Sequence, residues 1–162
     1  MPGKDLKALF HHTLEDIYFA ESAILKALPK MAAAAQTEAL RGAFQVHLKE
    51  TENQVKRLEQ VFKAAGERPQ AVECKAIQGI IEEGEEIIEE FSGGDALDAG
   101  LIAAAQAVEH YEITRYGTLL AWAKQLGLSE AEGLLKETLI EEENTDELLS
   151  ELAEDMVNPA AA

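Results

Sequence analysis

Cysteine is almost absent from this chain. The single cysteine, Cys74, has no second thiol for an intrachain disulfide, and a cluster of thiolate metal ligands is excluded. Long apolar runs are missing too, since none approaches the ~18 residues of a membrane span. The residues after Met1 lead into an amphipathic stretch and do not look like the apolar core of a signal peptide. We therefore expect a cytoplasmic protein that does not enter a membrane.

Positive charge is scarce as well. The 14 Lys and Arg residues stand against 31 Asp and Glu residues, which gives a net charge of −17 over 162 residues. This balance argues against binding nucleic acid through a basic patch and against docking on an anionic membrane surface. It favours solubility and attracts cations. With 47% hydrophobic residues, the chain can form one domain with a sizeable core.

Proline is rare and lies mostly outside the periodic stretches of the sequence. Among the four prolines, only Pro29 falls inside a helical pattern, where it predicts a kink. The apolar spacing predicts helices over about 4–35, 38–65, 72–91, 96–125 and 129–156. Asp95 is placed to cap the fourth of these, and Ser129 with Glu132 forms a capping box for the fifth.

The connections between these helices predict the fold. Tight turns join the first helix to the second and the fourth to the fifth, whereas about 30 residues link the two hairpins and include the helix at 72–91. Tight turns make antiparallel neighbours, and one long crossover is typical of ferritin-like bundles. The predicted fold is therefore all-α, a ferritin-like four-helix bundle whose long crossover contains an extra short helix. We expect a single domain over 1–158 and a frayed tail at 159–162.

Acidic residues occupy positions that should be buried. Apolar residues recur at alternating steps of four and three along each long helix, and acids interrupt three of these stripes. Glu21 interrupts the first stripe, Glu109 and Glu112 a second, and Glu142 and Asp146 a third. Burying an ionised carboxylate is costly unless a positive charge compensates it. These positions therefore indicate a functional site.

The acids also share one height in the predicted bundle. Glu21 lies about 16 residues before the turn near Thr37, and Glu50 lies about 13 residues after it, so at ~1.5 Å per residue they differ by about one helical turn or less. The acids of the second hairpin lie about 15 to 18 residues on either side of the turn at Gly127. We therefore expect one carboxylate layer at mid-height.

Electrostatic repulsion makes such a layer unstable unless it is compensated. Two unit charges ~4 Å apart repel by about 4 kcal/mol at an effective dielectric of ~20. The layer must take up protons, recruit Lys or Arg, hydrate, or bind cations. Bridging carboxylates suit Fe or Mn. The predicted metal ligands are Glu21, Glu50, Glu109, Glu112, Glu142, Asp146 and His47.

Three of these positions leave alternatives open. Glu21 could instead be an acid at the flank of its helix. His47 could be a ligand, could orient Glu50 three residues later, or could be a histidine at the edge of the core bonded to a carboxylate or a backbone carbonyl. Asp146 could instead bond Tyr18 or Tyr116. The remaining acids of the last helix, Glu141, Glu143, Glu147 and Glu151, are interpreted as a solvated face, and His11, His12 and His110 as structural.

Four stretches together resemble a known family, the YciE/YciF-type bacterial stress proteins of the ferritin-like, rubrerythrin-like superfamily. They are LEDIYFAE at 14–21, HLKETENQ at 47–54, EHYEITRYG at 109–117 and TLIEEENTD at 138–146. The resemblance covers almost the whole chain. It implies a rubrerythrin-like fold, a homodimer, a di-metal site by analogy with rubrerythrin, and an association with stress.

The sequence departs from the usual di-iron pattern. Di-iron bundles use Glu-x-x-His on two helices, but here Asn53 follows Glu50 and Thr145 follows Glu142 at that spacing. A Cys-x-x-Cys pair is also missing, so the rubredoxin-type iron domain of rubrerythrin is absent. We therefore expect no internal electron donor. A site of carboxylates with at most one histidine could bind metal weakly or hold a metal other than iron.

Two functions remain as hypotheses. The first is a stress-associated protein with a carboxylate-rich di-metal site of Fe or Mn, acting as an oxidase or peroxidase on ferrous iron or peroxide. The alternative is a non-enzymatic structural or interaction dimer with a degenerate metal site, in which the helix at 72–91 serves dimerisation or partner docking.

Overall fold

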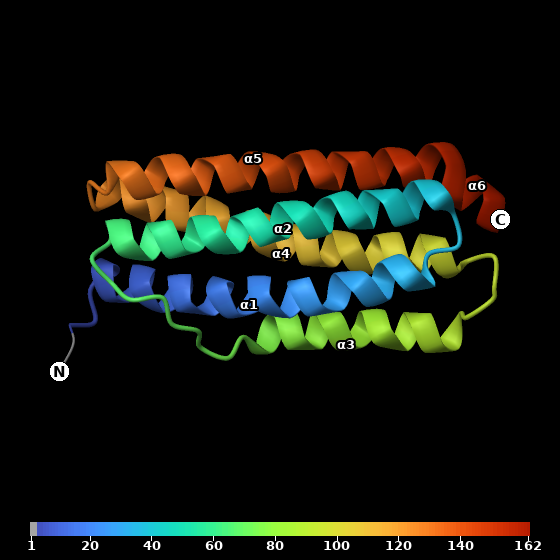
Figure 1. Cartoon of the computed structure of the whole chain (residues 1–162), viewed down its shortest axis with the longest axis horizontal. Helices are drawn as coiled ribbons and strands as arrows, with labels where there is room; N and C mark the ends of the chain where they lie inside the picture. Colours follow the sequence, from blue (N-terminus) through green and yellow to red (C-terminus); the bar gives the residue numbers. More distant parts are fainter. Residues whose placement is uncertain (1–2) are drawn as a thin grey trace.

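A computed structural model describes residues 3–162, and every regular element in this range is a helix. The elements are α1 (Leu6–Ala34), α2 (Glu38–Ala64), α3 (Lys75–Glu90), α4 (Leu97–Gln125), α5 (Ser129–Leu152), a π-helical turn (Ala153–Val157) and α6 (Asn158–Ala161). The four long helices α1, α2, α4 and α5 run side by side along the long axis of the molecule (Figure 1). α1 continues through Pro29, so the proline does not end the helix.

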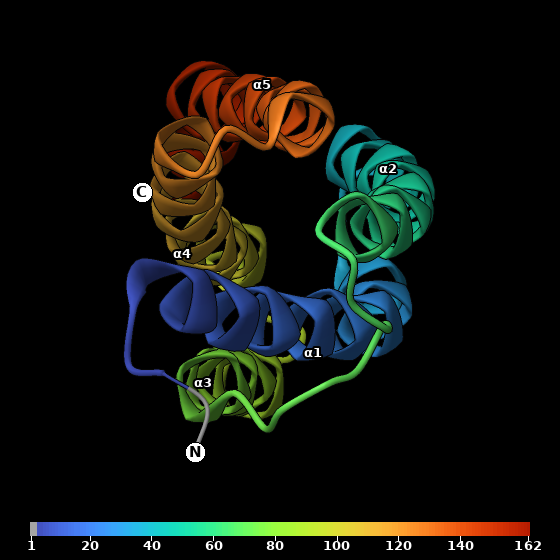
Figure 2. The ribbon, with the colours of Figure 1, turned by 90° about the vertical axis from the view of Figure 1, so that its left-hand side faces the viewer.

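The long helices form a ring when viewed along the bundle axis (Figure 2). α1 packs against α2, and α4 packs against α5, while contacts between α2 and α5 and between α1 and α4 close the bundle. α3 lies outside this ring against α1 and α4. The predicted all-α class is confirmed: the chain forms a four-helix bundle with an extra helix in its crossover.

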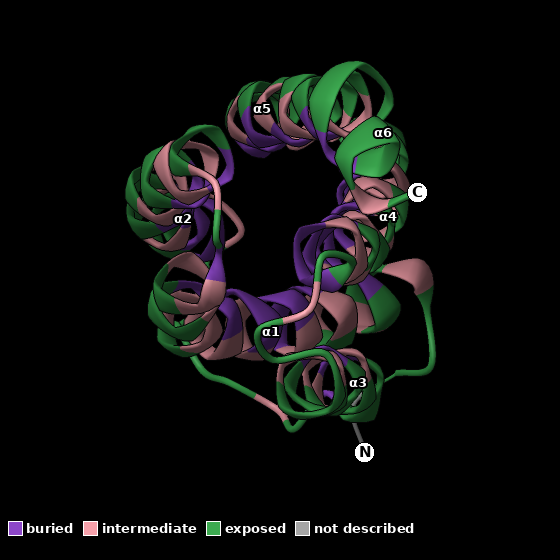
Figure 3. Ribbon diagram, turned by 90° about the vertical axis from the view of Figure 1, so that its right-hand side faces the viewer, coloured by how far each residue is buried: buried purple, intermediate pink, exposed green. Residues whose placement is uncertain are grey.

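The buried faces point into the ring (Figure 3). In α1 and α4 the buried residues follow the predicted stripes closely, and the predicted acids Glu21, Glu109 and Glu112 are as fully buried as the leucines around them. In α5 the stripe is less regular, because Thr138 is buried and Leu139 is only half-buried. Amphipathic spacing therefore placed the inner faces of the bundle correctly, with deviations in its last helix.

The end of the α5 stripe is displaced by one residue. A π-helical turn occupies Ala153–Val157, and such a turn inserts an additional residue into the helical repeat. The phase therefore shifts, so that Val157 is buried at 4% exposure while Met156 is 46% exposed. The alternating steps of four and three along this helix predict an inward Met156, and the inserted residue makes that prediction wrong.

The two predicted caps are wrong. Ala96 and Leu128 precede α4 and α5, and neither helix has a side-chain cap. Ser129 is already the first residue of α5, so its hydroxyl cannot cap that helix. Both helices instead begin after short turns, and their first turns carry acids that oppose the positive end of the helix dipole.

A different acid fixes the first hairpin. The carboxylate of Asp98, in the first turn of α4, accepts hydrogen bonds from the backbone N–H groups of Gln36 and Thr37 at 2.8 and 2.9 Å. The Thr37 hydroxyl donates a third at 2.7 Å. Asp98 thereby ties the turn between α1 and α2 to the start of α4, which sets the height of one hairpin against the other.

Two further expectations concern membrane spans and the boundary of the domain. None of the helices within residues 3–162 combines the length and apolar character that a bilayer span requires. At the C-terminal end, α6 adds one helical turn over 158–161. The domain boundary at 158 and the frayed tail at 159–162 remain predictions.

Candidate metal centre

Four buried side chains converge at the middle of the bundle. His47 comes from α2, Glu109 and Glu112 from α4, and Glu142 from α5. One potential ligand atom from each lies within 4.8 Å of all the others. All four side chains are buried, the carboxylates at 0% exposure and His47 at 3%. Helical spacing placed each residue on its inner face, but only the packing of three helices makes them neighbours.

Glu21 brings the fourth helix, α1, to the same layer. It is fully buried, and its Oε1 accepts a hydrogen bond from the Tyr116 hydroxyl at 3.0 Å. Its carboxylate lies next to Glu112, and each of the two changes the pKa of the other. The alternative in which Glu21 bonds only at the edge of its helix does not fit this burial. The layer thus contains four buried glutamates and one histidine.

Most polar atoms of this layer lack a partner from the protein. Among residues 3–162, the buried atoms at this level without a hydrogen bond are both carboxylate oxygens of Glu109, Glu112 and Glu142, one oxygen of Glu21, and both ring nitrogens of His47. Buried polar groups are nearly always hydrogen-bonded, and an unpaired one is costly. This concentration of unpaired acceptors is what a site prepared for cations would present.

The spacing of the donor atoms fits a shared ion. The Nε2 atom of His47 lies 3.0 Å from a Glu109 oxygen and 3.9 Å from a Glu142 oxygen, but the geometry of a hydrogen bond is not met. Two ligands at right angles on an ion, each at about 2.1 Å, lie about 3 Å apart. Oxygen donors with one imidazole suit Fe or Mn. The residues present therefore fit a metal ion.

Burial and mutual repulsion shift the acid–base behaviour of the layer. Loss of hydration raises the pKa of Glu109 and of Glu112 well above the usual value, and neighbouring carboxylates raise both further. Burial raises the pKa of Glu21 to about 8, although Glu112 and Tyr116 partly offset this effect. Burial lowers the pKa of His47, which keeps the ring neutral and able to bind a metal. Without a cation, the layer retains protons at neutral pH.

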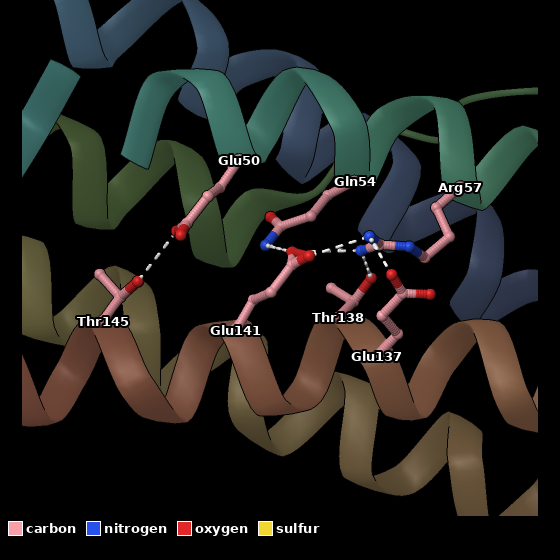
Figure 4. Close-up of polar contacts among 7 residues, drawn as sticks. All are labelled: Glu50, Gln54, Arg57, Glu137, Thr138, Glu141 and Thr145. Carbon is pink, nitrogen blue, oxygen red and sulfur yellow. Dashed lines mark hydrogen bonds and ion pairs between the residues drawn. The ribbon is translucent and has the colours of Figure 1, made fainter. Parts of the chain in front are cut away.

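Glu50 lies beside this group and is only half-buried. Its Oε2 accepts a hydrogen bond from the Thr145 hydroxyl at 3.2 Å across the seam between α2 and α5 (Figure 4). Partial burial raises the pKa of Glu50, with the bond to Thr145 acting in the opposite direction. Glu50 and His47 both line a pocket of about 110 Å³ in this seam, the α2–α5 pocket. Glu50 is thus placed at the rim of the layer.

Asp146 is drawn away from the layer. Its Oδ2 lies 3.0 Å from Nε2 of His110, and Gln106 donates to its other oxygen at 3.3 Å. Four residues after Glu142, Asp146 is rotated by about 40° around α5, and its short side chain meets α4 near the surface. The geometry argues against Asp146 as a ligand, and the alternative partners Tyr18 and Tyr116 are wrong, since they bond Glu59 and Glu21.

Sequence reasoning missed the charged contact that borders the layer. Arg57 of α2 donates to Glu141 at 2.9 and 3.1 Å, to Glu137 at 3.0 Å and to the Thr138 hydroxyl at 2.7 Å (Figure 4). The Gln54 amide donates to the same Glu141 carboxylate at 3.1 Å. The interpretation of Glu141 as solvated is therefore wrong. The sequence offered one signal for this contact. Gln54 and Arg57 share a face of α2, and Thr138 and Glu141 share a face of α5, because each pair is three residues apart.

The fold and this layer together define a class of protein, a four-helix bundle with a buried carboxylate–histidine group that could hold a metal ion. The chain belongs to the family described as "Domain of unknown function (DUF892)", which it matches over residues 5–162. It is 46% identical over 162 residues to protein YciF of Escherichia coli K12, with 99% of this chain and 98% of that protein covered. The predicted resemblance is confirmed.

Solved structures agree with this placement. The crystal structure of the E. coli stress protein YciF superposes with a TM-score of 0.92 at 46% identity, covering 96% of this chain and 99% of that one. A Rhodopseudomonas palustris protein, YcfI, described as a candidate structural protein, gives 0.88 at 46% identity over 91% and 94%. A Xanthomonas campestris protein shares the fold, with a TM-score of 0.74 at 19% identity over 95% and 94%.

Proposed function

We propose that this chain is a stress-associated protein that binds two Fe or Mn ions in the carboxylate layer and handles peroxide or ferrous iron. The observation that carries the proposal is the set of buried carboxylate oxygens that have no hydrogen-bond partner among residues 3–162. The stress association rests on the family, since a relative of 46% identity is described as a stress protein. A homodimer belongs to the same proposal and rests on the resemblance, and a cytoplasmic location remains the expectation from the sequence.

Charge balance supports two ions rather than one. The four buried glutamates, Glu21, Glu109, Glu112 and Glu142, carry four negative charges when ionised, and a neutral His47 adds none. Two divalent cations would neutralise them. Glu112 adjoins Glu21 on one side and belongs with His47, Glu109 and Glu142 on the other. Glu112 would therefore help to hold both ions.

Two hydroxyl groups hold carboxylates of the predicted ligand set in place. The Tyr116 hydroxyl holds Glu21, and Thr145 holds Glu50 at the α2–α5 pocket, where a cation could reach His47. Arg57 and Glu141 hold α2 and α5 together beside this pocket. When bound, the ions would supply Lewis acidity and one-electron chemistry toward an oxidant.

Metal stoichiometry tests the proposal. Purified protein is titrated anaerobically with Fe(II) or Mn(II), freed of unbound metal and analysed for metal content. We expect about two ions per chain, following the charge balance above. Glu142→Gln should lose bound metal, whereas Glu143→Gln, which changes the adjacent exposed acid, should not. Metal at background level, together with an unchanged melting temperature on adding either ion, would contradict the proposal.

The second candidate is a non-enzymatic structural or interaction protein with a degenerate site. It is favoured by the description of the R. palustris relative as a candidate structural protein. In that case the layer would be kept neutral by protons, as the raised pKa values of Glu109 and Glu112 allow. The same titration separates the two candidates, because a degenerate site takes up no stoichiometric metal.

A further inference from the structure

A second cavity reaches the centre of the bundle from the side that α3 covers. This cavity of about 30 Å³, the α3 cavity, lies among side chains of α1, α3 and α4 and ends at His47 of α2. Its walls include Ile24, Leu28, Ala105 and Val108, and its lining is apolar except for Lys30, His47 and Glu85. Figure 2 shows α3 resting on the outside of α1 and α4 at this face.

The two ends of the α3 cavity differ in character. At the outer end, Lys30 of α1 and Glu85 of α3 form an ion pair at 3.1 Å, with 67% and 47% of their side chains exposed. At the inner end, the His47 ring is 3% exposed and lies 3.0 Å from Glu109 of the carboxylate layer. The cavity thus connects an exposed ion pair with a residue of the candidate metal centre.

Small residues keep this space open. Gly84 is buried in α3, and a Cβ atom placed there would lie 3.6 Å from the Cβ of Ala104 on α4, which is ordinary contact. A methyl group would therefore be tolerated, but a larger side chain would have to extend into the cavity. Glycine inside a helix costs about 1 kcal/mol relative to alanine, so Gly84 is not retained for helix stability.

The apolar lining selects what can occupy the space. A volume of about 30 Å³ is enough for one or two small molecules, since a water needs about 10–15 Å³, and an apolar cavity holds apolar guests such as xenon. Cations and hydrogen peroxide would lose hydration or hydrogen bonds there without replacement. The α2–α5 pocket, which Glu50, Asn144 and Thr145 line, offers those polar species partners, and His47 borders both spaces.

We propose that the α3 cavity admits and holds a small apolar gas, dioxygen, beside His47, while polar species reach the same layer from the α2–α5 side. This inference rests on the proposed function for its physiological meaning, because it names dioxygen as the oxidant that the site receives from this face. The occupancy of the cavity by an apolar gas does not depend on bound metal.

Xenon is the probe for the cavity itself. Metal-free protein is crystallised and pressurised with xenon, and the same binding is followed in solution by xenon-129 NMR. We expect xenon between Gly84 and His47 in the unaltered chain and its loss in Gly84→Leu. The matched control is Gly79→Leu, at an exposed position of α3 with open space around it, where xenon should remain. Absence of xenon from the cavity in the unaltered chain overturns the proposal.

A second variant guards against misfolding. Ala104→Leu approaches the cavity from α4 and should also displace xenon, and thermal melts followed by circular dichroism verify that each variant is folded. Xenon that remains at this position in both folded filling variants contradicts the proposal. If the chain proves to bind no metal yet still takes up xenon, the proposed function fails and the gas cavity stands.

The choice of oxidant gives a further readout. Protein loaded with Fe(II) is mixed with dioxygen or with hydrogen peroxide, and the oxidation rate is followed by absorbance. Gly84→Leu should slow the reaction with dioxygen and leave the reaction with peroxide unchanged, and Gly79→Leu should leave both unchanged. Equal slowing of both reactions in Gly84→Leu would show that the cavity does not separate the two oxidants.

Discussion

Two acidic regions of the bundle differ in whether side chains of this protein compensate their negative charge. At the α2–α5 seam, the side chains of Arg57 and Gln54 both donate hydrogen bonds to the Glu141 carboxylate. In the interior layer, Glu109 and Glu112 are buried at 0% exposure, and none of their oxygens has a partner within the described chain. The Glu141 carboxylate thus has a cation and an amide of the chain as partners, whereas the carboxylates of the layer require protons or cations from outside.

The comparison teaches that acidity alone does not mark a metal site. The acids of both regions occur in the same helix, since Glu141 and Glu142 are adjacent in α5. What differs is the direction of the side chain, which decides whether a cation of the chain or a cation from solution can reach it. A substitution that removes the charge partner of the seam should therefore leave the carboxylate layer unchanged.

The largest expected effect is a loss of stability of the metal-free protein as pH rises. The folded-state pKa of Glu21 is about 8 against an ordinary value of 4.5, and those of Glu109 and Glu112 are also raised. The folded state therefore binds more protons than the unfolded state above pH 4.5, and the free energy of unfolding falls as pH increases through about 8. The loss should be on the order of 5 kcal/mol.

Denaturant unfolding at several pH values measures this loss. His47 acts with the opposite sign, since its lowered pKa favours the folded state only above its ordinary value of 6.5, but it is one group against three. Bound metal should remove the decline, because cations replace the protons on the carboxylates. A metal-free protein whose stability is flat or rises between about pH 5 and pH 8 would contradict the assignment of an unpaired layer.

A smaller effect is expected when the seam loses its cation. Arg57→Met keeps much of the length of the side chain but leaves the partly buried Glu141 without its ion pair, so we expect a loss of about 1–3 kcal/mol in the free energy of unfolding. The exposed ion pair with Glu137 adds little to this figure. The matched control is Arg68→Met at an exposed position.

The metal stoichiometry of Arg57→Met should be unchanged, since Arg57 compensates the seam and not the layer. Urea unfolding and metal analysis on the same preparation measure both quantities. Equal losses in Arg57→Met and Arg68→Met would show that the seam is not a stabilising contact. Loss of metal together with retained stability would show that the two regions are one site.

The smallest effect is expected inside the layer at Tyr116. Tyr116→Phe removes the hydrogen bond that the Tyr116 hydroxyl donates to Glu21, so the pKa of Glu21 should rise above about 8. In metal-free protein the stability change should be about 1 kcal/mol, the usual net contribution of such a bond. The high-pH limb of the stability curve measures it.

Tyr18→Phe is the control for Tyr116→Phe, because Tyr18 donates a similar bond at 3.0 Å to Glu59 near the surface. It should leave the pH dependence unchanged. If the two variants shift the high-pH limb equally, the hydroxyl of Tyr116 does not act through Glu21.

Much of the carboxylate layer could be predicted from the sequence, and the reason is helical geometry. Glu21, Glu109, Glu112 and Glu142 each interrupt an apolar stripe, and a stripe is set by the 3.6-residue repeat alone. Asp146 shows the limit of that rule, because the same spacing placed it inward while Gln106 and His110 hold it against α4 near the surface. Whether these residues bind metal remains a prediction.

Contacts between helices could be predicted from the sequence far less well than the inward faces of single helices. Arg57 was overlooked because its partners, Glu137, Thr138 and Glu141, lie 80 or more residues away on α5. The link from Asp98 to the turn at Thr37 spans 61 residues and likewise has no local signal. The π-helical turn that exposes Met156 could not be predicted either, because a constant spacing of 3.6 residues per turn does not include an inserted residue.

By itself, the sequence determined five helices, the two hairpins and the inward side of the buried glutamates, because hydrophobic spacing and short turns act locally along the chain. Only the tertiary structure decided which acids meet, which receive Arg57, and how α3 encloses an apolar space ending at His47. Those outcomes depend on the relative height and rotation of helices, and such quantities are set by packing across the bundle rather than by neighbours in the chain.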